Sequence, residues 1–226
     1  MPLEADAFAA LARETVDFQA AGLTIHEGLV VDRRVAWCVG GVGGAAAARA
    51  TQLLVDGHRP AVVVTAGFAG GLDRSLARGS VVRPSRALSG SGGPPLDLPA
   101  GQGTTGDVAI VSVPRVITTA AAKRDLAAAT GAAVVDMESY AVADAARAAG
   151  LPCAVIRVVS DDAAQDLPRE IAALVQPQSG MRRLGAALGA IGRRPRAALD
   201  MWQLWEHAVV DGRTLAVALE DFLRRC

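Results

Sequence analysis

Along the 226 residues, segments with apolar residues at strand spacing alternate with segments that have them at helical spacing. This pattern predicts strands and helices in succession. Continuous β-branched runs, which are typical of strands buried on both faces, occupy 61–66, 108–113 and 153–159. Shorter strands are expected at 23–31, 34–39, 81–82 and 133–136. Alanine-rich stretches that stop near glycine predict helices at 45–56, 120–130 and 138–149. The pattern therefore predicts an α/β fold, in which a mixed, mostly parallel central sheet is flanked by helices.

Four further segments have distinct patterns. Apolar residues at helical spacing, from Leu3 to Val16, predict a single helix over 2–20. Glycine clusters at 40–44 and 67–71 predict a loop and a turn. Residues 89–107 are rich in Gly, Ser and Pro without periodicity, so they predict a loop.

The composition changes from Gly180 onward, where arginines cluster ahead of Trp202 and Trp205. We therefore expect an α/β domain over 1–178 and a helical C-terminal extension over 179–226 packed on it. A second interpretation of this tail is peripheral membrane contact, because basic residues mixed with Trp and Leu suit a membrane surface. The docked helix is the preferred interpretation.

Composition and charge narrow the classes of function. The chain carries 23 basic and 23 acidic residues, so it lacks the positive charge typical of a nucleic-acid binder. Its three cysteines are widely spaced and have no CxxC motif, which argues against a disulfide framework or a zinc site. With no signal-peptide pattern and no apolar run of membrane-spanning length, the expected location is the cytoplasm.

Two carboxylates are predicted to meet at one edge of the sheet. Glu138 follows the short strand that ends at Asp136, and Asp161 ends the strand at 153–159. A carboxylate such as Glu138 can accept hydrogen bonds from two hydroxyls at once, which suits a vicinal diol. Asp161, if burial keeps it protonated, can act as a general acid. Taken singly, these residues could equally be a helix-start acid and a strand-end cap.

Four segments, in order, resemble the nucleoside phosphorylase superfamily: VGGVGGAAAA at 39–48, TAGFAGGLDRSLARGSVV at 65–82, DMES at 136–139 and RVVSDDA at 157–163. The resemblance implies that Glu138 binds the ribose hydroxyls and that Met137 packs against the sugar. It implies that Asp161 donates a proton to purine N7 and that Ser160 orients its carboxyl group. Gly43, Gly67 and Phe68 would complete the substrate-binding set.

The resemblance leaves two nucleophiles open, phosphate and water. Water is favoured because the glycine loop holds no arginine and because Phe68 stands where phosphate users tend to place a small hydroxyl residue. The opening PLEADAF at 2–8 is similar to that of the hydrolytic members, which makes Glu4 the candidate water-activating base.

Within the hydrolytic members, the hopanoid-associated nucleosidases, which remove adenine from adenosylhopane, are the most similar branch. Futalosine hydrolase and methylthioadenosine/adenosylhomocysteine nucleosidase are near rivals. The implied partner is a small purine nucleoside, with no metal or organic cofactor, in a homodimer. A phosphorylase and a non-catalytic nucleoside-binding module remain the alternatives.

The chain departs from the family at its start. In the family a buried β-strand runs directly into the glutamate loop, whereas Met1 stands here where that strand should end. Loss of that strand would leave sheet edges unpaired and a large void beside them, unless the rest of the fold compensates.

Overall fold

The computed structural model describes residues 2–99, 107–167 and 197–226, and within these ranges it leaves undescribed the side chains of 2–4 and 197–206. Five helices are described: α1 (Pro2–Ala9), α2 (Gly44–His58), α3 (Ala120–Thr130), α4 (Ser139–Ala148) and α7 (Ala197–Arg225). The predicted boundary between 178 and 179 lies outside the described residues, so the division into domains stays a prediction.

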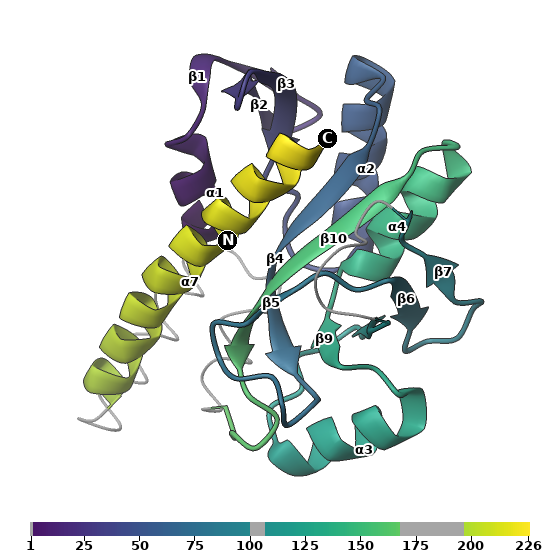
Figure 1. The fold of residues 1–226 in the computed structure, drawn as a ribbon, viewed down its shortest axis with the longest axis vertical. Helices are drawn as coiled ribbons and strands as arrows, with labels where there is room; N and C mark the ends of the chain where they lie inside the picture. The colour runs from purple at the N-terminus through teal and green to yellow at the C-terminus, as the bar shows by residue number, and fades with distance from the viewer. Residues whose placement is uncertain (1, 100–106, 168–196) are drawn as a thin grey trace.

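The strands form two separate sheets. A three-stranded antiparallel sheet is made of β1 (Arg13–Ala20), β2 (Leu23–Val30) and β3 (Arg33–Cys38). A seven-stranded sheet has the order β5-β10-β4-β9-β8-β6-β7. Its strands are β4 (Val63–Gly71), β5 (Val81–Val82), β6 (Arg86–Ser89), β7 (Leu96–Asp97), β8 (Ala109–Ser112), β9 (Val134–Asp136) and β10 (Cys153–Asp161). The larger sheet mixes parallel and antiparallel pairs and is flanked by helices (Figure 1), which confirms the predicted fold class.

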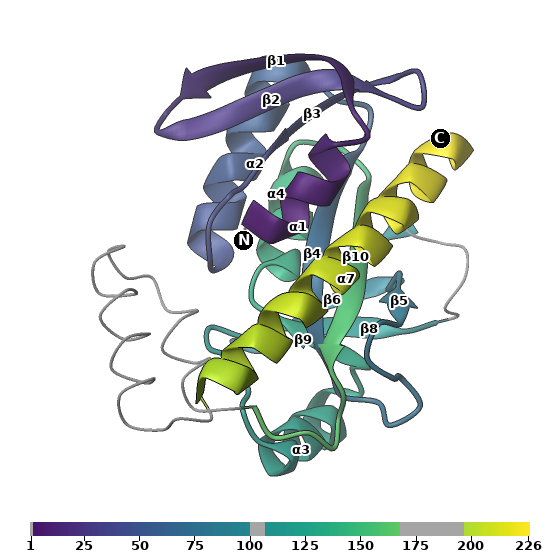
Figure 2. The same ribbon diagram turned by 90° about the vertical axis from the view of Figure 1, so that its left-hand side faces the viewer.

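The central strand β10 is buried on both faces, as its continuous apolar run predicts. Val155 and Val159 point to the face covered by α2 and α4. Ile156 and Val158 point to the opposite face, where they pack against α7. Because successive side chains of a strand alternate between faces, one strand supports two apolar cores, and the diagonal course of α7 over β10 is visible in Figure 2.

The described part of α7 is docked on the domain by polar as well as apolar contacts. Arg78 Nη2 donates to Asp211 Oδ2 at 2.7 Å, and Arg83 Nη2 donates to the backbone oxygen of Ala218 at 3.0 Å. Leu215 and Phe222 are buried against the large sheet. This agrees with the docked interpretation of the tail, whereas its arginine cluster lies outside the described residues.

Two predictions about local structure are wrong. The helix expected over 2–20 ends at Ala9, and 13–20 form β1, in which Val16 is 60% exposed. In RETVDFQA the apolar residues Val16 and Phe18 recur every second position, which is the strand period, and pairing with β2 decides the outcome. The glycine cluster 67–71 is not a turn, because it forms the second half of β4 paired with β10.

The loop expected over 89–107 also carries more order than predicted. It contains β7, which pairs with β6, and the side chains of Leu96 and Leu98 are buried. These two leucines anchor the segment on the core, so their burial overrides the Gly, Ser and Pro composition around them.

The facing edges of β3 and β4 are open within the described residues. β3 pairs only with β2, and β4 pairs with β10 on one side but with β9 only at Gly70 and Gly71 on the other. Val63 to Thr65 are consequently only half-buried and Ala66 is exposed, although β4 lies in the middle of its sheet. A cavity of about 1550 Å³ is lined by both strands. The unpaired edges and the void expected from the sequence are both present.

Candidate active site

A bulge at the end of β10 brings Ser160 and Asp161 together. Val159 pairs with Ala69 and Asp161 pairs with Gly70, so Ser160 is the extra residue. Consecutive side chains of a regular strand point to opposite faces, and a bulge re-aims them. Here the Ser160 hydroxyl donates to Asp161 Oδ1 at 2.6 Å. Ser160 is therefore placed to orient the Asp161 carboxyl group.

Glycine at the end of β4 makes room for this carboxyl group. A Cβ atom on Gly70 would lie 3.3 Å from Asp161 Oδ2 and 3.2 Å from Val135 Cγ1. A Cβ atom on Gly71 would lie 3.2 Å from the backbone oxygen of Asp161. The glycine cluster thus serves close approach within a strand rather than a turn.

A buried lysine contacts the same carboxyl group from the other side. Lys123 in α3 is fully buried, and its Nζ lies 2.5 Å from Asp161 Oδ2. It also donates to the backbone oxygens of Asp162 at 2.6 Å and Gln165 at 3.1 Å. The ammonium group therefore ties α3 to the segment that follows β10.

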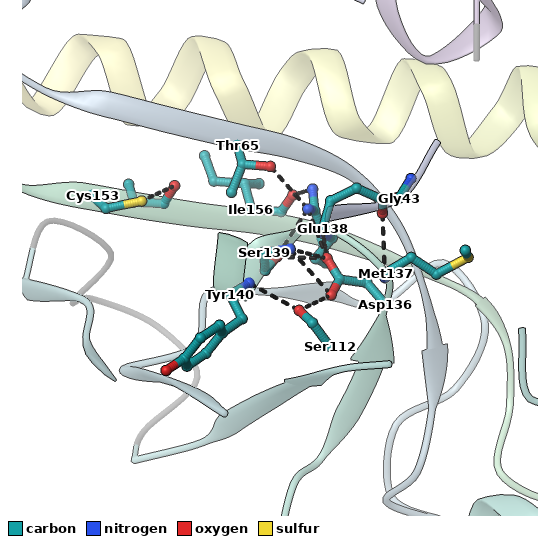
Figure 3. Close-up of polar contacts among 12 residues, drawn as sticks. Gly43, Thr65, Ser112, Asp136, Met137, Glu138, Ser139, Tyr140, Cys153 and Ile156 are labelled. Atoms are coloured by element: carbon teal, nitrogen blue, oxygen red, sulfur yellow. Dashed lines mark hydrogen bonds and ion pairs between the residues drawn. The ribbon is translucent and has the colours of Figure 1, made fainter. Parts of the chain in front are cut away.

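The first acid of DMES belongs to a buried scaffold. Asp136 ends β9 and accepts hydrogen bonds from the hydroxyls of Ser112 and Ser139, both at 2.6 Å (Figure 3). Arg157 Nη2 lies 2.8 Å from Asp136 Oδ2, and both side chains are at most 3% exposed. Arg157 Nη2 also donates to Thr65 Oγ1 at 2.9 Å. Arg157 is therefore a structural partner of the Asp136 carboxylate, and the pair fixes the β9–α4 connection.

Glu138 projects from that connection toward the glycine loop. It stands at the N-cap of α4, yet its side chain caps nothing. Instead Glu138 Oε1 accepts from the backbone N–H of Gly43 at 2.7 Å, and Oε2 accepts from the N–H of Met137 at 3.2 Å. Burial raises the pKa of Glu138, and the negative charge of Asp136 adds to this, against lowering by the two N–H groups and by Arg157.

One cavity collects most of the residues predicted to form the site. Its wall includes Gly67, Phe68, Met137, Glu138, Ser160 and Asp161. Gly43 is joined to that wall through its hydrogen bond to Glu138. Glu4 lies in α1, with its side chain outside the described part, while Ala5 and Phe8 of the same helix line the cavity. The six wall residues and Gly43 meet where β4, β9 and β10 end.

Two arginines at this cavity are committed to protein partners. Arg157 is held by Asp136, Thr65 and Ser139. Arg78 Nε donates to the backbone oxygen of Ser160 at 3.1 Å, and its Nη2 pairs with Asp211. By contrast, the carboxylates of Glu138 and Asp161 both reach the wall. The site is thus equipped to bind hydroxyl groups and to exchange a proton.

Sequence reasoning assigned no role to Lys123 or to Asp136. The available signal for Lys123 was composition, because it is the chain's one lysine among 23 basic residues. The signal for Asp136 was its place between a buried strand and Glu138, a position equally compatible with a strand-end cap. Neither signal identifies the partner of the residue. The partner of Lys123 is Asp161, 38 residues away, and the partner of Asp136 is Arg157, 21 residues away.

Comparison with known sequences identifies a family for most of the chain. Residues 1–112 and 103–190 match the profile of the Phosphorylase superfamily. A 5'-methylthioadenosine/S-adenosylhomocysteine nucleosidase of Colwellia psychrerythraea is 30% identical over 211 residues, covering 76% of this chain and 87% of that protein. The same-named protein of Glaesserella parasuis is 39% identical over 64 residues, 28% of each chain.

Solved structures with a similar fold have related names. The nucleosidase of Neisseria meningitidis in complex with methylthio-immucillin-A has a TM-score of 0.75, with 17% identity, and 100% of this chain and 96% of that chain are covered. Futalosine hydrolase of Helicobacter pylori has a TM-score of 0.74, with 15% identity, and coverage of 100% and 95%. These identities show the fold alone, but the sequence matches show the family: the chain belongs to the Phosphorylase superfamily.

Proposed function

We propose that the chain hydrolyses the N-glycosidic bond of a 5′-substituted adenosine and releases adenine. The observation that carries the proposal is the meeting of Glu138 and the Ser160–Asp161 pair on one cavity wall, at the ends of β9 and β10, which flank β4. A diol-accepting carboxylate and a second, oriented carboxyl group are the two functions that cleavage of a purine nucleoside requires. The names of the relatives support the same reaction class.

In the proposed reaction Glu138 accepts the ribose 2′- and 3′-hydroxyls, and Met137 packs against the sugar. The Asp161 carboxyl group transfers its proton to purine N7 as the C1′–N9 bond breaks and its electron pair moves to the base. Positive charge develops on the ribose, and the carboxylates around it stabilise that charge. Water adds to C1′, and Glu4 is the candidate base that takes the proton of that water.

Water is proposed over phosphate as the nucleophile. The glycine loop presents no arginine, and Arg157 and Arg78 are engaged with protein oxygens. Arg33, Arg34 and Arg115, which are exposed and line the cavity, are the cations that a phosphate-dependent reaction would have available among the described residues. The choice is decided by product analysis: hydrolysis gives free ribose sugar at a rate independent of phosphate. Ribose 1-phosphate, formed only with phosphate, would instead establish the phosphorylase alternative.

For the 5′ substituent we propose an adenosylhopane-like group, which would place the reaction in hopanoid biosynthesis. This rests on the likeness of three features to the hopanoid-associated branch: PLEADAF at 2–8, the segment AGFAGGLD at 66–73 with the LARGSVV that follows at 76–82, and the arginine-rich C-terminal tail. The test compares kcat/KM for adenosylhopane, futalosine and 5′-methylthioadenosine. Preference for either of the last two would reject the hopanoid assignment and leave the nucleosidase proposal intact.

Assembly and location are proposed with the function. We propose a homodimer, to be tested by light scattering on the eluting protein. Among the described helices, none is both long and apolar enough to cross a membrane. Surface contact through the arginine-rich tail, on a protein expected in the cytoplasm, is tested by liposome co-sedimentation. Binding lost on deletion of 180–226 would support that contact, and absence of binding would reject it.

A further inference from the structure

The surroundings of Lys123 match an ammonium group. Its Nζ donates to the backbone oxygens of Asp162 at 2.6 Å and Gln165 at 3.1 Å, and it lies 2.5 Å from Asp161 Oδ2. The contact with Asp161 is an ion pair rather than a hydrogen bond. A fully buried nitrogen surrounded by three oxygen atoms, one of them from a carboxyl group, suits an ammonium group, which has three N–H donors and no lone pair.

A buried cation at this position bears on the proton donor. Asp161 is 6% exposed, the Ser160 hydroxyl donates to its Oδ1 at 2.6 Å, and Lys123 Nζ lies 2.5 Å from its Oδ2. These contacts suit the carboxylate form of Asp161, which is the form present after the proton has been transferred. Once Asp161 has given a proton to purine N7 it carries a negative charge in a site with little water. A cation already in place stabilises that charge without any rearrangement at the moment of reaction.

The residue type fits this task better than the arginine that the chain uses at its other 22 basic positions. An ammonium group is a compact point charge with three donors, whereas a guanidinium group is a broad planar fork. The carboxylate and two carbonyl oxygens come from one short segment, Asp161 to Gln165, and converge on a single atom. A compact group suits this arrangement, in which all three oxygen atoms surround a single nitrogen.

We propose that Lys123 is the positioning residue of the proton donor: it fixes the Asp161 carboxyl group and stabilises the carboxylate left after proton transfer to the leaving base. The proposal rests on the proposed function, in which Asp161 protonates N7. Lys123 acts only on departure of the base, because it contacts Asp161 and not the ribose-binding Glu138. Its removal should therefore slow only substrates whose leaving group needs a proton.

The test compares two substrates with the same 5′ group. The purine nucleoside needs protonation to release its base, whereas the corresponding 4-nitrophenyl riboside releases a stable anion without it. Lys123→Met should lower kcat for the purine nucleoside by at least about tenfold and leave that for the nitrophenyl riboside nearly unchanged. Asp161→Asn should show the same split. The double variant should be little worse than Asp161→Asn alone, because both changes remove one function.

Two control variants separate this role from general damage to α3. Arg124→Met changes the exposed neighbour in the same helix and should alter neither substrate. Thr119→Ala removes the N-cap, whose hydroxyl accepts from the N–H of Ala122, and should destabilise the helix without the split. Equal losses of Lys123→Met on both substrates, or losses that add to those of Asp161→Asn, would overturn the inference. Failure of the wild type to release any purine would reject the proposed function instead.

A measurement on the wild type avoids dependence on a variant that fails to fold. Because the chain has one lysine, labelling with ¹⁵N-lysine gives a single Nζ signal. We expect an ammonium signal protected from solvent exchange and shifted in Asp161→Asn. A rapidly exchanging signal, or one that is unchanged in Asp161→Asn, would contradict the proposed ion pair.

Discussion

The backbone N–H of Gly43 donates to Glu138 Oε1 at 2.7 Å, across 95 positions of sequence. The φ angle of Gly43 is +92°, a conformation that an L-residue with a side chain adopts only with strain. The glycine loop therefore presents its N–H group to the carboxylate, and the carboxylate is held beside the cavity. Two sequence motifs that look independent form one binding element.

Replacing Glu138 by Gln should impair recognition of the ribose diol. A hydrogen bond to a charged group contributes roughly 1.5–3 kcal/mol, so kcat/KM should fall about 10- to 100-fold. The dideoxy analogue that lacks both hydroxyls should be cleaved equally by Glu138→Gln and by the wild type. Asp144→Asn, in the same helix but half-exposed, is the matched control and should change neither substrate. If Glu138→Gln preferred the riboside to the dideoxy analogue as strongly as the wild type does, Glu138 would not bind the diol.

As the pH falls, recognition of the diol should be lost at a higher pH than it would be if Glu138 were exposed to solvent. Burial and the charge of Asp136 raise the pKa of Glu138, so the carboxylate takes up a proton while an exposed glutamate is still ionised. The protonated group accepts hydroxyls less well, so binding is lost as the pH falls through the raised value. The quantity to follow is the ratio of kcat/KM for the riboside to that for its dideoxy analogue. A ratio constant down to the usual glutamate range would contradict the effect.

Removing Arg157 should destabilise the fold. Arg157→Met leaves the Asp136 carboxylate buried without its countercharge, which costs about 3–5 kcal/mol in comparable pairs. Urea denaturation followed by circular dichroism measures this loss. Arg147→Met breaks the exposed pair with Asp144 and should have little effect. If Arg157→Met and Arg147→Met unfolded at similar urea concentrations, the buried pair would not be needed for stability.

Filling the space between β3 and β4 should stabilise the protein. An extended segment of apolar, β-branched residues joined ahead of Pro2 could pair with both open edges and fill the part of the cavity that lies between them. A gain of 1 kcal/mol corresponds to about 2–4 °C in melting temperature at this chain length, and we expect at least that. Amide hydrogens of β3 and β4 should also exchange more slowly. The same segment with a central proline is the control, since proline cannot donate to the ladder.

If the apolar and proline-containing segments gave the same melting temperature and the same exchange, the edges would not accept a strand.

The sequence predicted those features that depend on local pattern. The helix at 120–130 and the buried strand from Cys153 follow from periodicity and glycine stops, and both are confirmed. The strand 13–20 was missed because a short amphipathic segment fits both periods, and only pairing with β2 decides between them. Gly67 to Gly71 were taken for a turn because glycine composition does not reveal that Asp161 needs the space of the missing side chains.

The active site also has features that the local sequence pattern predicts and features that depend on distant contacts. The meeting of Met137 and Glu138 with Ser160 and Asp161 was predicted from strand ends gathering at one edge of a parallel sheet. The residues do meet, but β9 runs antiparallel to β4 whereas β10 runs parallel to it, so the shortness of β9 rather than a shared strand direction brings them together. The bulge at Ser160 and the three oxygen atoms around Lys123 were not predictable, because they depend on contacts between distant segments.

The measurement that tests the central claim most directly is adenine release from the preferred 5′-substituted adenosine, by the wild type and by Asp161→Asn, without phosphate. We expect release by the wild type and a loss of roughly 10²- to 10⁴-fold in the variant, the usual contribution of a positioned general acid. Binding of the nucleoside with no release by the wild type, unchanged in Asp161→Asn, would contradict the account and identify a non-catalytic nucleoside-binding module.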